Sequence, residues 1–150
     1  MKVYKGRVII PGNVEGEILV SKTGFNILAS FKQAISSGDS CAVCSDHNNS
    51  YLYRKDLKNK IICIPQATGS TTAGIIIQTI AALNKCPKAF LFSETAESLA
   101  ISGVILADIW ENTPICTIDG LGEEFLREIK DNQIAQILSD GTVIIKEKGE

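Results

Sequence analysis

The sequence predicts one mixed α/β domain over residues 1–150, with a central β–α–β unit between β-rich N-terminal and C-terminal parts. Residues 60–64 are apolar, rich in β-branched side chains and stopped by Pro65, a pattern typical of a buried strand. Residues 73–83 are nearly all small or apolar and are long enough for a buried helix. Residues 88–92 again favour a strand, so we expect a β–α–β unit with a right-handed crossover.

The N-terminal part contains two β-rich runs, at 3–10 and 15–21, joined through Pro11-Gly12-Asn13. We expect them to form a hairpin-like start. Residues 22–40 are rich in turn formers and are predicted to be irregular, apart from a short apolar anchor at 25–28. Beyond them we expect a short strand at residues 41–44, followed by a polar loop.

The C-terminal part continues the alternation of helices and strands. We expect a helix over 96–111, interrupted or bent near Ser102-Gly103, and then a strand over 114–118. A charged amphipathic helix is predicted over 122–130. Residues 134–146 favour a hairpin around an Asp-Gly turn.

Composition excludes several classes of protein. The chain is 45% hydrophobic and 21% charged with a net charge of −2, as in ordinary soluble domains. There is no basic excess to indicate nucleic acid and no polybasic cluster to indicate a membrane surface. No apolar run reaches the roughly 18–20 residues of a membrane span, and the first residues lack the pattern of a signal peptide. We expect a cytoplasmic protein with neither a nucleic-acid nor a membrane partner.

The segment between the central strand and helix carries the most distinctive chemistry. Gly69 permits backbone conformations closed to other residues and lets a ligand approach the main chain. Ser70, Thr71 and Thr72 follow, where the first free N–H groups of the helix point outward. Such an arrangement binds carboxylate or phosphate oxygens, so the sequence predicts an anion site that contains a hydroxyl.

A simpler role for these hydroxyls stays open, because Ser70 or Thr71 would also serve as an ordinary N-cap. Two other phosphate or acyl-transfer motifs are excluded. The Lys-Ser/Thr pair of a P-loop is missing after Gly74, and no Gly-x-Ser-x-Gly nucleophile elbow surrounds Ser70.

The five cysteines are an odd number without a secretion signal, which indicates reduced thiols. Cys41 and Cys44 have Cys-x-x-Cys spacing and, with His47, would offer three zinc ligands, so a metal or redox protein is one alternative. A structural zinc site needs a fourth ligand, and the polar segment that follows is poor material for a helix start. We therefore favour plain packing and assign no metal ligand.

His47 is the only histidine and lies beside Asp46 in the polar loop. A neighbouring carboxylate can orient an imidazole for proton transfer or for contact with a substrate. The alternative is a solvated loop histidine without a functional role.

The order of these pieces resembles the small subunit, or swivelling domain, of the aconitase X family. The Gly-Ser step with its hydroxyl neighbours is the most specific of the features that carry the resemblance. Together these features span most of the chain: Pro-Gly-x-x-x-Gly at 11–16, the His47 loop, the strand leading to Gly69-Ser70, the strand beginning Pro87-Lys88-Ala89, the small-residue helix with Gly103, and Thr113-Pro114-Ile115.

The resemblance implies a swivelling β/β/α domain that caps a separate, larger catalytic subunit. Together the two would form a hydro-lyase acting on a small hydroxy acid, as in archaeal mevalonate 5-phosphate dehydratases or bacterial hydroxyproline dehydratases. It implies that Ser70 is the catalytic residue that removes a proton, and we assign Gly69, Thr71, Thr72 and His47 to binding of a small anionic substrate. No cofactor is expected on this chain, and an iron–sulfur cluster is expected in the large partner.

The sequence departs from the family pattern in two places. Thr68 stands where relatives usually carry a basic residue, and residues 33–37 replace a Gly-Gly-Val-Asp-Pro-like segment. Without Arg or Lys at 68, a cation that stabilises a Ser70 alkoxide would have to come from the partner chain. We expect the isolated chain to be inactive. A non-catalytic binding or regulatory module of the same fold is the alternative that this substitution supports.

Overall fold

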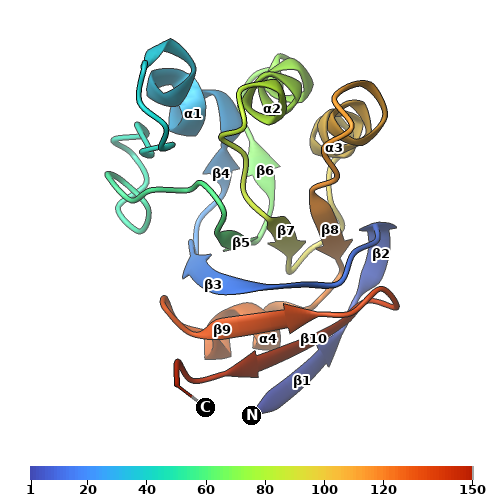
Figure 1. Ribbon diagram of the computed structural model, residues 1–150. Coiled ribbons are helices and arrows are strands. Elements are labelled where there is room, and N and C mark those ends of the chain that lie inside the picture. Colours follow the sequence, from blue (N-terminus) through green and yellow to red (C-terminus); the bar gives the residue numbers. More distant parts are fainter. Residues whose placement is uncertain (150) are drawn as a thin grey trace.

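The computed structural model describes residues 1–149, which form two β-sheets and the helices α1 to α4 (Figure 1). The helices are α1 (Ile27–Ser36), α2 (Ala73–Ala82), α3 (Ser98–Trp110) and α4 (Glu123–Glu128). The strands are β1 (Lys2–Lys5), β2 (Arg7–Ile10), β3 (Val14–Val20), β4 (Phe25–Asn26), β5 (Ile61–Ile64), β6 (Ala67–Thr68), β7 (Ala89–Phe92), β8 (Cys116–Asp119), β9 (Ile134–Ile137) and β10 (Thr142–Lys146). None of these helices is long and apolar enough to cross a membrane.

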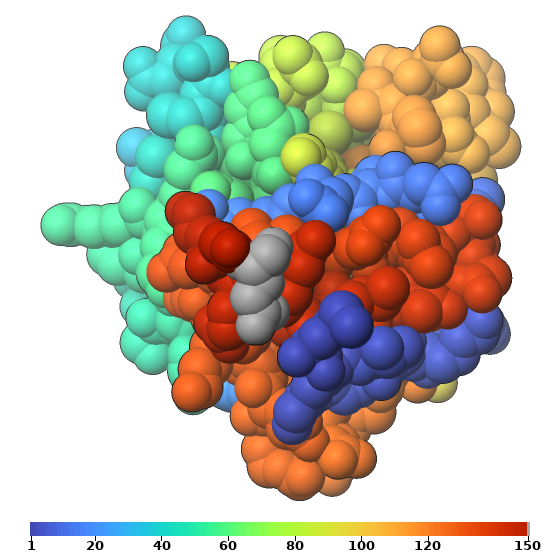
Figure 2. Space-filling model, turned by 60° about the horizontal axis from the view of Figure 1, so that its bottom comes forward, coloured from blue at the N-terminus to red at the C-terminus, as the bar shows by residue number. Residues whose placement is uncertain are grey.

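The main sheet has eight strands in the order β1-β10-β9-β3-β5-β7-β8-β2. Its centre, β3-β5-β7-β8, is parallel, and the remaining pairs are antiparallel. Gly6 alone separates β1 from β2, the strands at the two ends of this order, so the sheet must curl back on itself. On the side remote from α1, α2 and α3, the N-terminal strand lies against the C-terminal strands (Figure 2).

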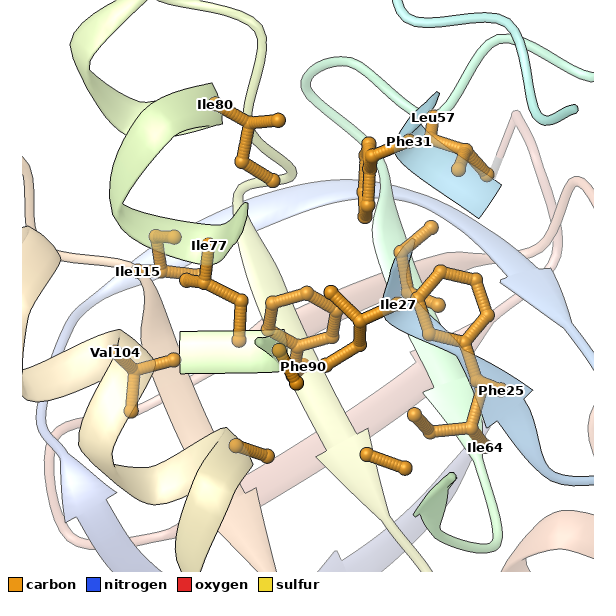
Figure 3. Packing of buried hydrophobic residues seen from close by; sticks show 14 of the residues in the cluster. Phe25, Ile27, Phe31, Leu57, Ile64, Ile77, Ile80, Phe90, Val104 and Ile115 are labelled. Atoms are coloured by element: carbon orange, nitrogen blue, oxygen red, sulfur yellow. The ribbon is translucent and has the colours of Figure 1, made fainter. Parts of the chain in front are cut away.

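Side chains of the parallel strands alternate between two hydrophobic cores, as a period of two residues requires. Ile62 and Ile64 of β5 contribute to the core beneath α1, α2 and α3, whereas Ile61 and Cys63 contribute to the core that α4 covers on the other side. Figure 3 shows the helix-side core around Phe25, with side chains from strands and helices converging on one region.

The predicted central unit is confirmed, because β5, α2 and β7 follow one another and the two strands pair in parallel. The C-terminal hairpin of β9 and β10 is confirmed as well. The amphipathic helix predicted over 122–130 is present as the shorter α4, which buries Phe125 and Leu126.

The predicted N-terminal hairpin is wrong. Strand β3 already has β5 on one side and β9 on the other, so it offers no edge to β2. Strand β2 pairs instead with β8 and completes the far end of the sheet. The strand expected at 41–44 is reduced to an isolated bridge between Val43 and Asp56.

The region 22–40, predicted to be irregular, contains helix α1. Asn26 caps this helix by accepting a hydrogen bond from the Ala29 N–H at 3.0 Å. The residues that α1 buries lie at helical spacing: Ile27, Ser30, Phe31 and Ala34. An asparagine followed by this apolar pattern is the signal that would have predicted the helix.

Helix α3 runs without the interruption expected near Ser102-Gly103. Gly103 serves a packing purpose instead, because a Cβ atom there would lie 3.0 Å from the Gly74 Cα of α2. The two glycines therefore let α2 and α3 approach closely, and any larger side chain would push the helices apart.

Asp119 anchors the end of β8 to two other parts of the chain. Its buried carboxylate accepts a bidentate pair of hydrogen bonds from Arg7, at 2.9 and 2.7 Å, and another from the Ala96 N–H at 2.8 Å. Burial alone would raise the pKa of Asp119, but the Arg7 guanidinium and the Ala96 N–H outweigh it and hold the pKa below its usual value.

This arrangement makes the free energy of unfolding dependent on pH. Because the folded pKa of Asp119 is lowered, its stabilisation is present above about pH 4 and is lost as the pH falls through the folded pKa. We expect Asp119→Asn to be less stable than the wild type at pH 7, with the difference shrinking toward pH 2–3. Urea unfolding of both proteins across this pH range measures the difference in their free energies of unfolding. A difference that does not change with pH would contradict this role of Asp119.

Candidate functional site

Strand β6 leads directly into the Gly69-Ser70 step and is held in place by β4. The two pair in parallel, Phe25 with Ala67 and Asn26 with Thr68. Gly69 has a φ of +103°, and a Cβ atom there would lie 2.8 Å from the Asn26 side chain, which already caps α1. Glycine is therefore required at position 69 both for its backbone conformation and for the contact with Asn26.

Ser70 closes a turn just before helix α2. Its Oγ accepts the Thr72 N–H at 3.1 Å and lies 2.9 Å from the Thr72 Oγ1, while its carbonyl accepts the Ala73 N–H at 3.2 Å. Thr72 occupies the N-cap position, but its side chain caps no helix N–H. Within residues 1–149 the N–H groups of Gly74 and Ile75 have no acceptor.

The Ser70 hydroxyl therefore caps the turn that leads into α2, as the N-cap alternative expects, whereas Thr71 makes no such bond in the part of the chain that the structure describes. The Ser70 hydroxyl forms a short turn with Thr72, ahead of the helix, and Thr71 is exposed. Unsatisfied N–H groups at the start of α2 favour a nearby negative charge, including an alkoxide.

Ser70 is half-buried in a small hollow of about 50 Å³. The residues that line the hollow are Ala67, Thr68, Gly69, Ser70, Ala73, Glu97 and Leu99, and none of them is a lysine or arginine. Sites for small molecules usually enclose about 300–1,000 Å³. The hollow is therefore too small to enclose a small-molecule ligand by itself, and its lining residues supply no cation.

Two residues outside the predicted site, Gln66 and Glu97, hold this edge of the sheet together. The Gln66 Oε1 accepts the Ala67 N–H at 3.1 Å and the Glu97 N–H at 2.9 Å, which ties the segment after β5 to the segment after β7. The Glu97 carboxylate in turn caps α3 by accepting the N–H groups of Leu99 and Ala100. An acidic residue directly before a helix is typical of an N-cap, so the position of Glu97 in the sequence indicates this role.

His47 is exposed and does not line the Ser70 hollow. Its ring centroid lies 4.6 Å from that of Tyr53. The Asp46 carboxylate, which was expected to orient the imidazole, accepts the Asn48 N–H at 3.0 Å. The loop is anchored by Asn49, whose Nδ2 donates to the Ser21 Oγ at 3.1 Å.

The cysteines behave as packing residues. Cys44 is buried in the helix-side core, and burial raises the pKa of its thiol. Cys41 is only partly buried, and all five cysteines are free thiols. In the part of the chain that the structure describes, no three or more His, Cys, Asp or Glu side chains are grouped so that they could hold a metal ion.

Comparison with known proteins agrees with this architecture. The chain is 29% identical to the phosphomevalonate dehydratase small subunit of Thermococcus kodakarensis over 147 residues, 97% of this chain and 98% of the relative. It is 28% identical to the protein of the same name from Methanosarcina acetivorans over 97% of this chain and 92% of the relative. The crystal structure of Thermococcus kodakaraensis aconitase X in its holo-form superposes with a TM-score of 0.81 at 27% identity, covering 98% of this chain and all of that one.

The superposition confirms the swivelling-domain fold predicted from the resemblance. The family model of the aconitase X swivel domain matches residues 3–145, which is nearly the whole chain and includes the Gly69-Ser70 step. The protein therefore belongs to the aconitase X swivel-domain family.

Proposed function

We propose that this chain is the small subunit of a heteromeric aconitase X-type dehydratase, with mevalonate 5-phosphate as the favoured substrate. The observation that carries the proposal is the match to phosphomevalonate dehydratase small subunits over more than nine-tenths of both chains. A dehydratase for a hydroxyproline, the other activity implied by the resemblance, is the competing substrate assignment.

Ser70 is the proposed catalytic residue. Dehydration of a hydroxy acid breaks a C–H bond on one carbon and the C–O bond on the next, and the electrons of the C–H bond form the new carbon–carbon double bond. The leaving hydroxyl departs as water after taking up a proton, which the large subunit or the solvent would supply. In this scheme the Ser70 Oγ, as an alkoxide, takes the proton and becomes a neutral hydroxyl. The Thr72 N–H, 3.1 Å from the Oγ, and the free N–H groups at the start of α2 would stabilise the alkoxide.

The rest of the site is proposed to come from the large subunit. The hollow of about 50 Å³ is too small to enclose a substrate, and its only charged lining residue, Glu97, would repel an anion. The cation that family members usually carry before the Gly-Ser step must then lie on the partner, opposite the exposed Thr68. Gly69, Thr71 and Thr72 would contact the substrate from this side.

The expected iron–sulfur cluster is assigned to the large subunit, where it would supply Lewis-acid chemistry toward the leaving hydroxyl. The donor set of this chain does not suit such a cluster. Cys44, Cys63 and Cys116 are buried in the cores, and burial raises the pKa of each thiol.

A non-catalytic module of the same fold is the second candidate, and the acidic, cation-free hollow is the observation that favours it. Co-expression with the large-subunit gene of the same genome separates the two. The purified complex is assayed anaerobically with mevalonate 5-phosphate and with 3-hydroxyproline. We expect dehydration of the former. Turnover of only the latter would reassign the substrate, and an inactive complex would favour the module.

A further inference from the structure

A groove of about 320 Å³ lies at the carboxyl ends of β3, β5 and β7, on the side of the sheet that α4 covers (Figure 1). We call it the α4 groove, and it shares no lining residue with the Ser70 hollow. Its volume falls within the range of small-molecule sites. Ligands of parallel sheets commonly bind outside the carboxyl ends of the strands, so the groove lies where such a site is expected.

The strand side of the α4 groove continues the pattern of the core beneath α4. The last core residues of β3, β5 and β7 on this side pair across the sheet: Val20, Cys63 and Leu91. Two residues further along each chain segment, the period of two places Lys22, Pro65 and Ser93 on the same side. The groove is therefore built on regular strand geometry, just beyond the strand ends.

The hydroxyl of Ser93 is a buried polar group without a protein partner. Ser93 is 8% exposed, and within residues 1–149 its Oγ makes no hydrogen bond. Its backbone is fixed on both sides, because the N–H donates to the Ile64 carbonyl at 3.0 Å and the carbonyl accepts the Gly122 N–H at 2.9 Å. Burial of a hydroxyl is costly unless it is hydrogen-bonded. A ligand in the groove would complete this hydroxyl.

Two cations and two carboxylates surround the α4 groove, so its lining charges sum to zero. The Lys22 Nζ donates to the Leu126 carbonyl, which leaves two of its three N–H groups for another acceptor. In the described part of the chain, the side chains of Arg127, Glu94 and Glu123 make no hydrogen bond or ion pair. The groove thus offers free donors and free acceptors side by side.

We propose that the α4 groove binds a small zwitterion of the amino acid class. Lys22 and Arg127 would hold its carboxylate, to which the Ser93 hydroxyl donates, and Glu94 and Glu123 would hold its ammonium group. A simple anion would face the two carboxylates, and a simple cation would face Lys22 and Arg127. Only a ligand with both charges complements all four groups.

The apolar part of the lining narrows the class of ligand further. Pro65 and Leu126 lie between the charged groups of the α4 groove, and Leu126 is 8% exposed. An amino acid with an aliphatic side chain would cover this apolar surface. The inference concerns this chain alone and holds whether or not Ser70 is catalytic.

Titration of the full chain with L-leucine, followed by two-dimensional NMR, tests the proposal. We expect saturable shifts of the amide signals of Ser93, Glu94 and Gly122 at millimolar ligand concentrations. Isocaproate is leucine without its ammonium group, and isoamylamine is leucine without its carboxylate. Each should bind about tenfold more weakly, because each leaves two charged groups of the groove without a partner. Equal or tighter binding of isocaproate would indicate an anion site and overturn the proposal.

Glu94→Gln separates the two kinds of ligand most sharply. A zwitterion loses a partner of its ammonium group and binds about tenfold more weakly, whereas an anion loses a repelling charge and binds more tightly. Ser93→Ala and Arg127→Gln should each weaken leucine binding by a similar factor. Arg54→Gln is the matched control, since Arg54 is an exposed arginine that does not line the groove.

The dispersion of each NMR spectrum checks the fold. Glu94→Gln and Arg127→Gln change exposed side chains, so they keep the test valid if Ser93→Ala fails to fold. Absence of saturable shifts in the wild type, or the same affinity in the three variants as in the control, would overturn the inference. No large subunit is present in these titrations, so their failure would leave the proposed function standing.

Discussion

Replacing Ser70 by alanine is expected to lower the dehydration rate of the complex by about 10²-fold or more, the usual effect of losing a proton-transfer group. The substitution removes the Oγ but leaves the carbonyl that accepts the Ala73 N–H, so the turn before α2 persists. We therefore expect the loss in kcat, with little change in affinity for the large subunit. Steady-state kinetics of the complex, with binding measured separately, gives both quantities.

Ser139→Ala is the matched control for this experiment. Ser139 is an exposed serine in the turn between β9 and β10 and takes no part in the proposed site. If Ser70→Ala keeps the wild-type kcat, the serine is a turn residue and the base belongs to the partner. If both variants lose activity equally, the loss reflects damage to the complex.

Replacing Phe25 by alanine is expected to destabilise the domain by about 3–5 kcal/mol, since truncation of a buried phenylalanine leaves a cavity. Phe25 is fully buried and packs edge-on against Phe31, with ring centroids 5.9 Å apart, and lies 6.3 Å from Phe90 (Figure 3). Urea unfolding at neutral pH measures the cost.

Phe25→Ala is also expected to affect the candidate functional site. Phe25 belongs to β4, and its N–H donates to the Gln66 carbonyl at 2.9 Å, next to strand β6, which leads into Gly69. We therefore expect Phe25→Ala to lower activity as well as stability. Phe25→Leu, which keeps most of the volume, should cost less than about 1.5 kcal/mol. A cost below about 1 kcal/mol for the alanine variant would contradict this account of the core.

The centre of the fold could be predicted from local sequence because each element there is marked locally. The run 60–64 is apolar without interruption and ends at Pro65, so its limits and burial can be read directly. The N-terminal pairing could not, because β1 finds its partner β10 about 140 residues further along the chain. No local sequence pattern indicates such a long-range contact. The two β-rich runs around Pro11-Gly12 also match the pattern of a hairpin, which the chain does not form.

Helix α1 was missed for a different reason. Turn-forming residues such as Gly24 and Ser36-Ser37 stand at its two ends, and their number obscured the helical spacing of Ile27, Phe31 and Ala34 between them. Intrinsic propensity is a weak guide when tertiary burial of one face decides the structure.

At the site, the Gly69-Ser70 step was predicted because a strand, a glycine and a helix start are adjacent in sequence. The bonds that rigidify it were not, since Gln66 and Glu97 meet across 31 residues. His47 lies outside the Ser70 hollow because of the path of a long loop. The polar residues of this loop do not determine that path.

The most direct test of the central claim is reconstitution of the dehydratase from separately purified subunits. The large subunit is held at fixed concentration, this chain is titrated in, and dehydration of mevalonate 5-phosphate is followed anaerobically. We predict negligible turnover by either subunit alone and activity that rises with added chain until it saturates. Full activity of the large subunit alone, or turnover by the pure 150-residue chain, would contradict the account.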